Sequence, residues 1–415
     1  MISQKSRTVA AGTIGNFLEW YDFAIYGYFA AQIGATFFPR EDPVAQVLAA
    51  FGIFAVGYLM RPLGGIAIGI IGDRYGRRRA LALSVAAMAV PTFLVGALPG
   101  HETLGLAAPV LLTALRMIQG LSVGGEGTTS MVFLVEHAPP GRRGAIGALA
   151  SISASGGILL GSATGAAFAA AMSPEALAAW GWRIPFLIGL LVGIAGWWLR
   201  RGIVETPRGA VEHAPLAATL RLHGPLVIRL AGLVVYNAVG FYLMFLYLVS
   251  WLQTVDGLAP AQALGMNTAS MLVLLPVLLG MGWLSDRIGR KRLLMAATTL
   301  GFAGALPLFW LMHHPDPVLV LLGQMGFVLT LGTCLGIMPA IMVEATPRPV
   351  RCTAIALGYN VTFGILGGLT PLAAAWLIDR TAMDLSPAYM IMAAAAISFA
   401  SLLFYRESYR DDVAA

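Results

Sequence analysis

The chain has 415 residues, of which 58% are hydrophobic and only 11% are charged. Soluble domains carry about 25% charged residues, so this composition excludes a soluble globular protein and predicts a membrane protein. The net charge of +6 comes from basic residues spread over many loops. It therefore does not indicate a nucleic-acid-binding face, which needs basic residues gathered on one domain.

Apolar runs of membrane-spanning length alternate with short polar segments along the whole chain. The first run is too long for a secretory signal and lacks a cleavage pattern. Twelve spans are predicted, at approximately residues 9–34, 45–71, 80–99, 106–135, 144–172, 183–200, 225–252, 261–284, 293–312, 318–343, 352–378 and 387–405.

Lysine and arginine residues predict the orientation of these spans. They fall in every second loop, whereas the loops between hold only Arg40, Arg183 and Arg380. Because basic residues near short loops stay in the cytoplasm, both termini are predicted to be cytoplasmic. We therefore expect a multi-pass protein of the cell (inner) membrane, with the lipid bilayer as its surroundings.

The two halves of the chain repeat each other. GIIGDRYGRRR (69–79) returns as GWLSDRIGRKR (282–292), and FLVEHAPPGRRGAI (133–146) returns as IMVEATPRPVRCTAI (341–355). The predicted domains are an N-terminal six-helix bundle (1–200), a cytoplasmic middle loop (201–224) and a C-terminal six-helix bundle (225–415). Such duplication is typical of transporters whose two halves rock about a substrate site at their interface.

Several motifs carry a resemblance to a known family. The GxxxDRxGRR pattern at 69–78, its second copy at 282–291 and RMIQG at 116–120 resemble loop and helix motifs of the major facilitator superfamily. GNFLEWYDFAIYGY (15–28), MRPLGG (60–65), QGLSVGGE (119–126) and WGWRIPFLIG (180–189) resemble its metabolite:proton symporter branch. That branch includes carriers of citrate, 2-oxoglutarate, shikimate, dicarboxylates, proline and betaine.

The resemblance implies an all-α membrane protein with twelve transmembrane helices in two pseudo-symmetric six-helix bundles. It also implies alternating access, a proton as coupling ion with no other cofactor, and function as a monomer.

Five ionisable residues fall well inside the predicted spans, all in the first half: Glu19, Asp22, Arg61, Arg116 and Glu126. A charge at a helix centre costs about 2.5 to 3.5 kcal/mol, so each needs a reason. One interpretation is that they form ion pairs that hold helices together. The other is proton coupling by Glu19 and Asp22, which share a helix stripe, with Arg116 modulating them and Glu126 contributing.

Arginine side chains inside the spans are the candidate anchors for a substrate carboxylate, because a guanidinium matches carboxylate geometry and stays charged. Which of Arg61 and Arg116 binds substrate is left open. Ordinary hydrogen bonds between helices remain an equal alternative for the neutral candidates. The complete predicted substrate-binding set is Arg61, Arg116, Gln119, Tyr26, Asn237, Tyr242, Gln324 and Asn360.

The repeated loop motifs place acids and arginines at helix ends predicted to face the cytoplasm. By resemblance to the superfamily they form a latch that is closed when the cavity faces outward. The predicted gating residues are Asp73, Arg74, Arg77, Arg78, Glu136, Arg143, Asp286, Arg287, Arg290, Glu344 and Arg351.

The leading hypothesis is proton-coupled uptake of a small carboxylate-bearing metabolite, either an organic acid or a zwitterion such as proline or betaine. The alternatives are an efflux or exchange carrier of the same fold, and a nutrient sensor that does not transport. No nucleotide-binding loop, catalytic triad or metal-ligand cluster is found in the sequence, so neither an enzyme nor a metal site is expected.

Overall fold

The computed structural model describes residues 17, 19–39, 42–64, 67, 71, 77–122, 126–200, 216–407 and 409. Within these residues the regular structure is helical throughout, and no strand is formed. Helices suit a chain with this composition because each satisfies its own backbone hydrogen bonds inside hydrocarbon.

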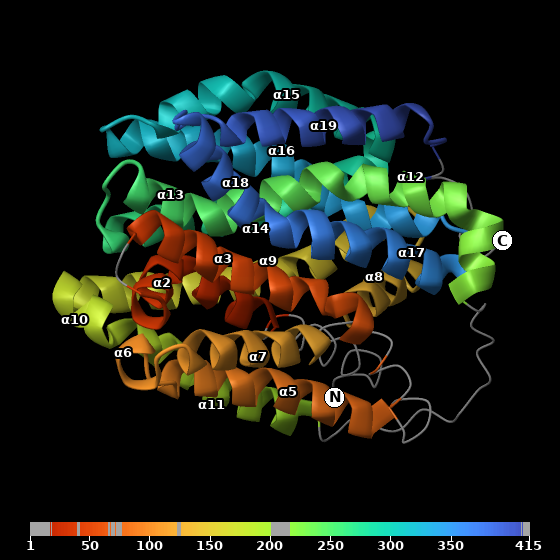
Figure 1. The fold of residues 1–415 in the computed structure, drawn as a ribbon. Helices are drawn as coiled ribbons and strands as arrows, with labels where there is room; N and C mark the ends of the chain where they lie inside the picture. The colour runs from red at the N-terminus through yellow and green to blue at the C-terminus, as the bar shows by residue number, and fades with distance from the viewer. Residues whose placement is uncertain are drawn as a thin grey trace.

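In the first half, residues 19–28 are helical and lead into the labelled elements shown in red to yellow in Figure 1. These elements are α2 (Ala30–Phe37), α3 (Pro43–Leu59), α5 (Arg77–Ala97), α6 (His101–Leu104), α7 (Ala107–Ser122), α8 (Glu126–Glu136), α9 (Arg143–Ala171), α10 (Pro174–Ala179), the 3₁₀ turn η1 (Gly181–Arg183) and α11 (Ile184–Arg200).

The second half is drawn in green to blue in Figure 1. Its elements are α12 (Leu216–Tyr242), the π-helical η2 (Leu243–Tyr247), α13 (Leu248–Thr254), α14 (Pro260–Ile288), α15 (Arg290–Met312), α16 (Pro317–Glu344), the 3₁₀ turn η3 (Arg348–Val350), α17 (Arg351–Val361), the π-helical η4 (Thr362–Gly367), α18 (Gly368–Thr381) and α19 (Pro387–Leu403).

Each of the twelve predicted apolar runs coincides with helix in the described part of the chain. Seven of the described helical segments are long and apolar enough to cross a membrane. Shorter apolar helices at Leu83–Ala97, Ala107–Ser122, Gly181–Leu191 and Pro387–Leu403 occupy four further runs, and residues 19–37 occupy the first. The predicted all-α membrane architecture is confirmed.

The predicted middle loop (201–224) is described only from residue 216 onward, where α12 has already begun. His223 interrupts this helix with φ −125° and ψ 21°, two residues before Pro225. A proline removes a backbone donor and clashes with the preceding turn, which accounts for the kink. Residues 216–222, before the kink, form a helical segment and not a loop. The domain boundaries inferred from the sequence stay predictions.

Contact between the halves runs along three pairs of helices. These pairs are α9 with α14, α9 with α16, and α3 with α18. In addition, α8 packs against α16 and α17. Figure 1 shows α3, α9, α14 and α18 between the red-to-yellow half and the green-to-blue half. Each pair joins a span of one half to a span of the other, as two rocking bundles require.

Two glycines bring α9 and α14 unusually close. A Cβ atom added at Gly282 would lie 2.6 Å from the carbonyl oxygen of Gly144 and 2.9 Å from Cβ of Ala148. Only residues without a side chain allow this backbone approach. Gly282 opens the second copy of the repeated motif, so its position is explained by contact between the halves.

Gly282→Ala is expected to lower stability by about 1 to 3 kcal/mol, because the added methyl group overpacks the α9–α14 contact. Gly280→Ala is the matched control, since a Cβ there meets no atom within 4 Å. Thermal unfolding in detergent micelles measures both. Equal melting temperatures for the two variants would show that the close approach is unimportant.

Candidate functional site

Glu19 and Asp22 lie on one helix but belong to two separate polar networks. Glu19 pairs with Arg61, and Asp22 pairs with Arg116. All four side chains are buried. The structure therefore divides the charges inside the spans into two ion pairs instead of gathering them at one point.

The Asp22 network lies inside the first half and joins the first helix to α5 and α7. Thr92 Oγ1 donates to Asp22 Oδ1 (2.5 Å), while Gln119 Nε2 (2.9 Å) and Arg116 Nη1 (3.2 Å) donate to Asp22 Oδ2. Gln119 Nε2 also donates to Thr92 Oγ1 (2.9 Å), and Arg116 Nη1 donates to Gln119 Oε1 (2.8 Å). Several donors on one buried carboxylate offset much of its desolvation cost.

Aromatic rings hold the Arg116 guanidinium in place. Its Cζ atom lies 4.2 Å from the centroid of Tyr26 and 4.9 Å from that of Phe23, both on the first helix. The Tyr26 hydroxyl in turn donates to the carbonyl oxygen of Ala50 on α3 (3.0 Å). Arg116, Gln119 and Tyr26, three predicted substrate-binding residues, are thus held around Asp22 by contacts within the first half.

The Glu19–Arg61 pair lies next to the interface between the halves. Arg61 Nη2 donates to Glu19 Oε1 at 3.1 Å. Neighbouring rings cross the interface: Trp20 contacts Phe241 with centroids 5.5 Å apart, and Tyr58 contacts Tyr242 at 5.1 Å. This pair is therefore placed where a substrate held between two rocking bundles would be bound.

Arg61 keeps unused hydrogen-bonding capacity. Its Nε and Nη1 atoms are buried and have no hydrogen-bond partner among the described residues. The guanidinium carbon lies 5.1 Å from the ring centroid of Tyr58 and 5.7 Å from that of Trp20. A buried cationic donor without an acceptor is costly, which makes it a candidate ligand contact.

The second half contributes neutral polar groups. Asn237 and Gln324 are buried, and neither amide has a hydrogen-bond partner within the described part of the chain. Tyr242 presents its ring to Trp20 (6.1 Å between centroids) and to Tyr58. Asn360 is partly buried on α17. Their roles in substrate binding stay predictions.

Some predicted residues lie outside the described side chains. Asp73 and Arg74 fall between residues 71 and 77, and Arg77 and Arg78 are described only as the backbone that begins α5. Glu126 likewise begins α8 without a described side chain. The first motif copy and the role of Glu126 therefore stay predictions.

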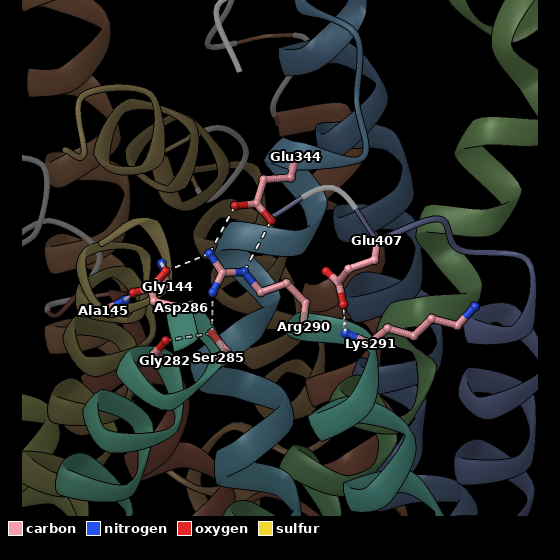
Figure 2. A network of polar contacts seen from close by, with 9 residues as sticks. All are labelled: Gly144, Ala145, Gly282, Ser285, Asp286, Arg290, Lys291, Glu344 and Glu407. Carbon is pink, nitrogen blue, oxygen red and sulfur yellow. Dashed lines mark hydrogen bonds and ion pairs between the residues drawn. The ribbon is translucent and has the colours of Figure 1, made fainter. Parts of the chain in front are cut away.

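The second motif copy joins the two halves at what we call the motif end, the end predicted to face the cytoplasm. Asp286 accepts hydrogen bonds from the backbone N–H groups of Gly144 (2.8 Å) and Ala145 (3.0 Å), as Figure 2 shows. These residues begin α9, whose own preceding residue Arg142 provides no capping side chain. A carboxylate from the other half thus satisfies the free donors of a helix N-terminus.

Arg290 connects this cap to α16 (Figure 2). Its Nη2 atom donates to Asp286 Oδ1 (2.7 Å) and to Glu344 Oε1 (3.1 Å), and its Nε atom donates to Glu344 Oε2 (3.2 Å). Nη1 donates to Ser285 Oγ at 2.7 Å. A guanidinium that bridges two carboxylates holds Asp286 in position for the cap.

The other predicted gating residues occupy different places. Arg351 Nη1 donates to Glu136 Oε1 at 2.5 Å and so joins α17 to α8 across the halves. Arg143 begins α9 beside the cap of Asp286. Arg287 is exposed, with its guanidinium 3.8 Å from the ring centroid of Trp283 on its own helix.

The opposite end of the molecule is also closed between the halves, by residues that were not predicted. The Tyr28 hydroxyl donates to the carbonyl oxygen of Phe245 (2.8 Å). Asn267 Nδ2 on α14 donates to Tyr28 Oη (2.9 Å) and to Ser162 Oγ on α9 (3.0 Å). The halves therefore contact each other on both sides of the Glu19–Arg61 region.

The unpredicted residues are uncharged, and that is why the sequence concealed them. Thr92 follows Pro91 in an apolar span, and Tyr58 lies two residues before the MRPLGG block. Asn267 is one of few side-chain amides in the second half, and that rarity was the only sign in the sequence that it has a role. Nothing in the spacing of these residues indicates that they meet Asp22, Arg61 or Tyr28.

Family models match both halves of the chain. One described as "Sugar (and other) transporter" matches residues 8–219, and one described as "Major Facilitator Superfamily" matches residues 258–414.

Two relatives match along most of the chain. The glycine betaine/proline/ectoine/pipecolic acid transporter of Dickeya dadantii is 33% identical over 418 residues, which cover 97% of this chain and 83% of the relative. The proline/betaine transporter of Salmonella typhimurium is 32% identical with the same coverage.

Solved structures share the fold at low identity. A D-xylose–proton symporter superposes with a TM-score of 0.80 at 17% identity, covering 99% of this chain and 100% of that one. A partially occluded, inward-open xylose transporter from E. coli gives 0.76 at 16% identity, covering 97% and 98%.

Thr92→Val is expected to destabilise the protein by about 1 to 3 kcal/mol, because Asp22 loses a donor and Gln119 loses an acceptor inside the bundle. Thr113→Val is the control, since that hydroxyl only donates to Pro109 in its own helix (2.8 Å). Unfolding of both variants in detergent gives the comparison. A similar loss of stability in both variants would contradict a special role for Thr92.

Asp286→Ala is expected to loosen the motif end, because α9 loses the carboxylate that caps it from the other half. The readout is the alkylation rate of a cysteine placed at buried Ala340, with Cys334 and Cys352 changed to serine. Asp316→Ala is the control: Asp316 caps α16, within one half, through Val318 N (2.9 Å). Only Asp286→Ala should speed alkylation, and an unchanged rate would remove Asp286 from the gate.

Proposed function

Because the chain belongs to the major facilitator superfamily of membrane transporters, we propose that it takes up a small carboxylate-bearing zwitterion together with a proton. Membership makes the chain a multi-pass membrane transporter and not an enzyme. Proton coupling, direction, substrate and location in the cell inner membrane are the parts we propose.

The observation that carries the proposal is that Arg61 lies next to the interface with unused donor atoms, whereas Arg116 is held within the first half. The Arg61 guanidinium is buried next to the interface, gives Nη2 to Glu19, and leaves Nε and Nη1 without acceptors among the described residues. Each of these atoms is a cationic donor that a carboxylate oxygen can accept from. Arg61 is therefore the proposed anchor for the substrate carboxylate, while Arg116 remains bound to Asp22.

The rings around Arg61 support a zwitterion over a simple organic acid. Trp20 and Tyr58 each contact Tyr242 across the interface, next to the carboxylate of Glu19. Aromatic faces attract ammonium groups, and quaternary ammonium groups in particular. Relatives named as proline/betaine transporters fit the same substrate class.

Arg61 also couples the protonation of Glu19 to substrate binding. Glu19 and the substrate carboxylate compete for one guanidinium, so protonation of Glu19 frees Arg61 for the substrate. Conversely, a substrate that occupies Arg61 favours the protonated form of Glu19. We propose Glu19 as the carboxylate coupled directly to binding, with Asp22 and Arg116 as the second proton-handling pair.

The contacts at the two ends supply the gates for alternating access. Asp286 with the N-terminus of α9 closes the motif end, and Tyr28 with Asn267 closes the other. Opening one set while the other holds exposes the Arg61 region to one side at a time. Glycine-mediated packing of α9 on α14 provides the surface about which the bundles rock.

Reconstitution in liposomes tests the proposal. An inward proton gradient should drive accumulation of labelled proline or glycine betaine above equilibrium, with citrate as the organic-acid comparison. Accumulation driven instead by an outward gradient would favour efflux or exchange. If none of the three compounds moves, the proposed substrate class is wrong.

Arg61→Gln is expected to weaken substrate affinity about ten- to hundredfold, because charge-assisted hydrogen bonds to the carboxylate are lost. Glu19→Gln should retain substrate exchange but lose accumulation driven by the gradient. Arg292→Gln, at an exposed position, is the control for a lost charge. Normal accumulation by Glu19→Gln would exclude Glu19 as the coupling carboxylate.

A further inference from the structure

A cavity of about 260 Å³ lies at the motif end of the second half, away from the Glu19–Arg61 region. It is bounded by α12, by the end of α16 and by the segment that follows α19. The proposed transport function assigns no role to this cavity.

One face of α12 forms a wall of the cavity. Leu226, Arg229, Leu230 and Leu233 all line it, and their spacing of three, four and seven residues places them on one stripe of the helix. The wall is thus apolar apart from one guanidinium. Arg406, in the segment after α19, brings a second guanidinium to the same cavity.

The charge of the cavity is positive. Among the described residues, Glu344 is the only acid that lines it, and the Glu344 carboxylate already accepts two hydrogen bonds from Arg290, as Figure 2 shows. Among the described residues, neither Arg229 nor Arg406 takes part in an ion pair. Two unpaired arginines in one recess favour an anion, and a phosphate accepts from both at once.

The surroundings of the cavity favour a lipid as the source of that anion. Phe404, which lines the cavity, and Ile228, next to Arg229 on α12, are 72% and 73% exposed. Such exposed apolar side chains suit contact with acyl chains. A basic pocket between spans at the cytoplasmic side has the chemistry of an anionic headgroup site. We infer that this cavity binds the phosphate headgroup of an anionic phospholipid through Arg229 and Arg406.

The site adjoins the gate at the motif end. Lys291 Nζ donates to the carbonyl oxygen of Tyr405 (2.8 Å). The backbone N–H of Lys291 donates to Glu407 Oε2 (2.8 Å), as Figure 2 shows. These contacts fasten the segment that carries Arg406 to the start of α15, beside Arg290. A headgroup that contacts both Arg229 and Arg406 therefore links α12 to α15. Arg290 of α15 donates to both Glu344 and Asp286.

The test is binding by the delipidated full chain in detergent, followed by native mass spectrometry and melting temperature. The probes are dioleoylphosphatidylglycerol, dioleoylphosphatidylcholine and inorganic phosphate. Phosphatidylglycerol should bind in preference to phosphatidylcholine and raise the melting temperature. Arg229→Gln and Arg406→Gln should each weaken it about tenfold, and Arg221→Gln, an exposed arginine of α12 outside the cavity, should leave it unchanged.

Three other outcomes are decisive. In the first, inorganic phosphate stabilises the protein as much as phosphatidylglycerol does, with the effect lost in the Arg229 and Arg406 variants. That result would support the phosphate site but identify its ligand as a soluble phosphate compound instead of a lipid. Equal binding of the two lipids would overturn the inference, as would equal effects of all three arginine substitutions. Because both arginines are exposed, the variants are expected to fold, and the binding readout does not depend on transport.

Discussion

A guanidinium buried inside a membrane protein needs a carboxylate partner, and this requirement organises the first half of the chain. Arg116 forms an ion pair with Asp22, and Arg61 forms an ion pair with Glu19. Each guanidinium keeps two buried nitrogens without acceptors among the described residues, Nε and Nη2 in Arg116 and Nε and Nη1 in Arg61. The two pairs differ in their surroundings. Asp22 also receives donors from Thr92 and Gln119 within the first half, whereas the Glu19–Arg61 pair lies next to rings that cross the interface between the halves.

The halves contact each other on both sides of the Glu19–Arg61 region. At the motif end, a carboxylate of the second half caps a helix of the first, and Arg290 holds that carboxylate with Glu344. At the opposite end, Asn267 bridges Tyr28 and Ser162. Each closure consists of a few hydrogen bonds between rigid bundles, so each can break without unfolding a helix. That property allows the two ends to open in turn.

Much of this arrangement was predictable from the sequence because its physical cause was visible there. The spans followed from apolar runs, and the buried charges stood out because charges inside spans are costly. Asp286, a predicted gating residue, was visible because its motif is repeated. The pairing of acids with arginines was not predictable, since Glu19 and Asp22 share a helix stripe and only tertiary packing separates their partners. Neutral residues such as Thr92 and Asn267 carry no comparable signal. The stretch 216–222 was predicted as loop because it lies between the sixth and seventh apolar runs, whereas it forms the start of α12.

The central claim is that Glu19 and the substrate carboxylate share Arg61. Calorimetric titration of the purified protein with glycine betaine or proline, in buffers of different protonation enthalpy, measures proton uptake on binding. The claim predicts uptake of about one proton per bound substrate by the native protein and none by Glu19→Gln, which should still bind. Binding by the native protein without proton uptake, or unchanged uptake by Glu19→Gln, would contradict it.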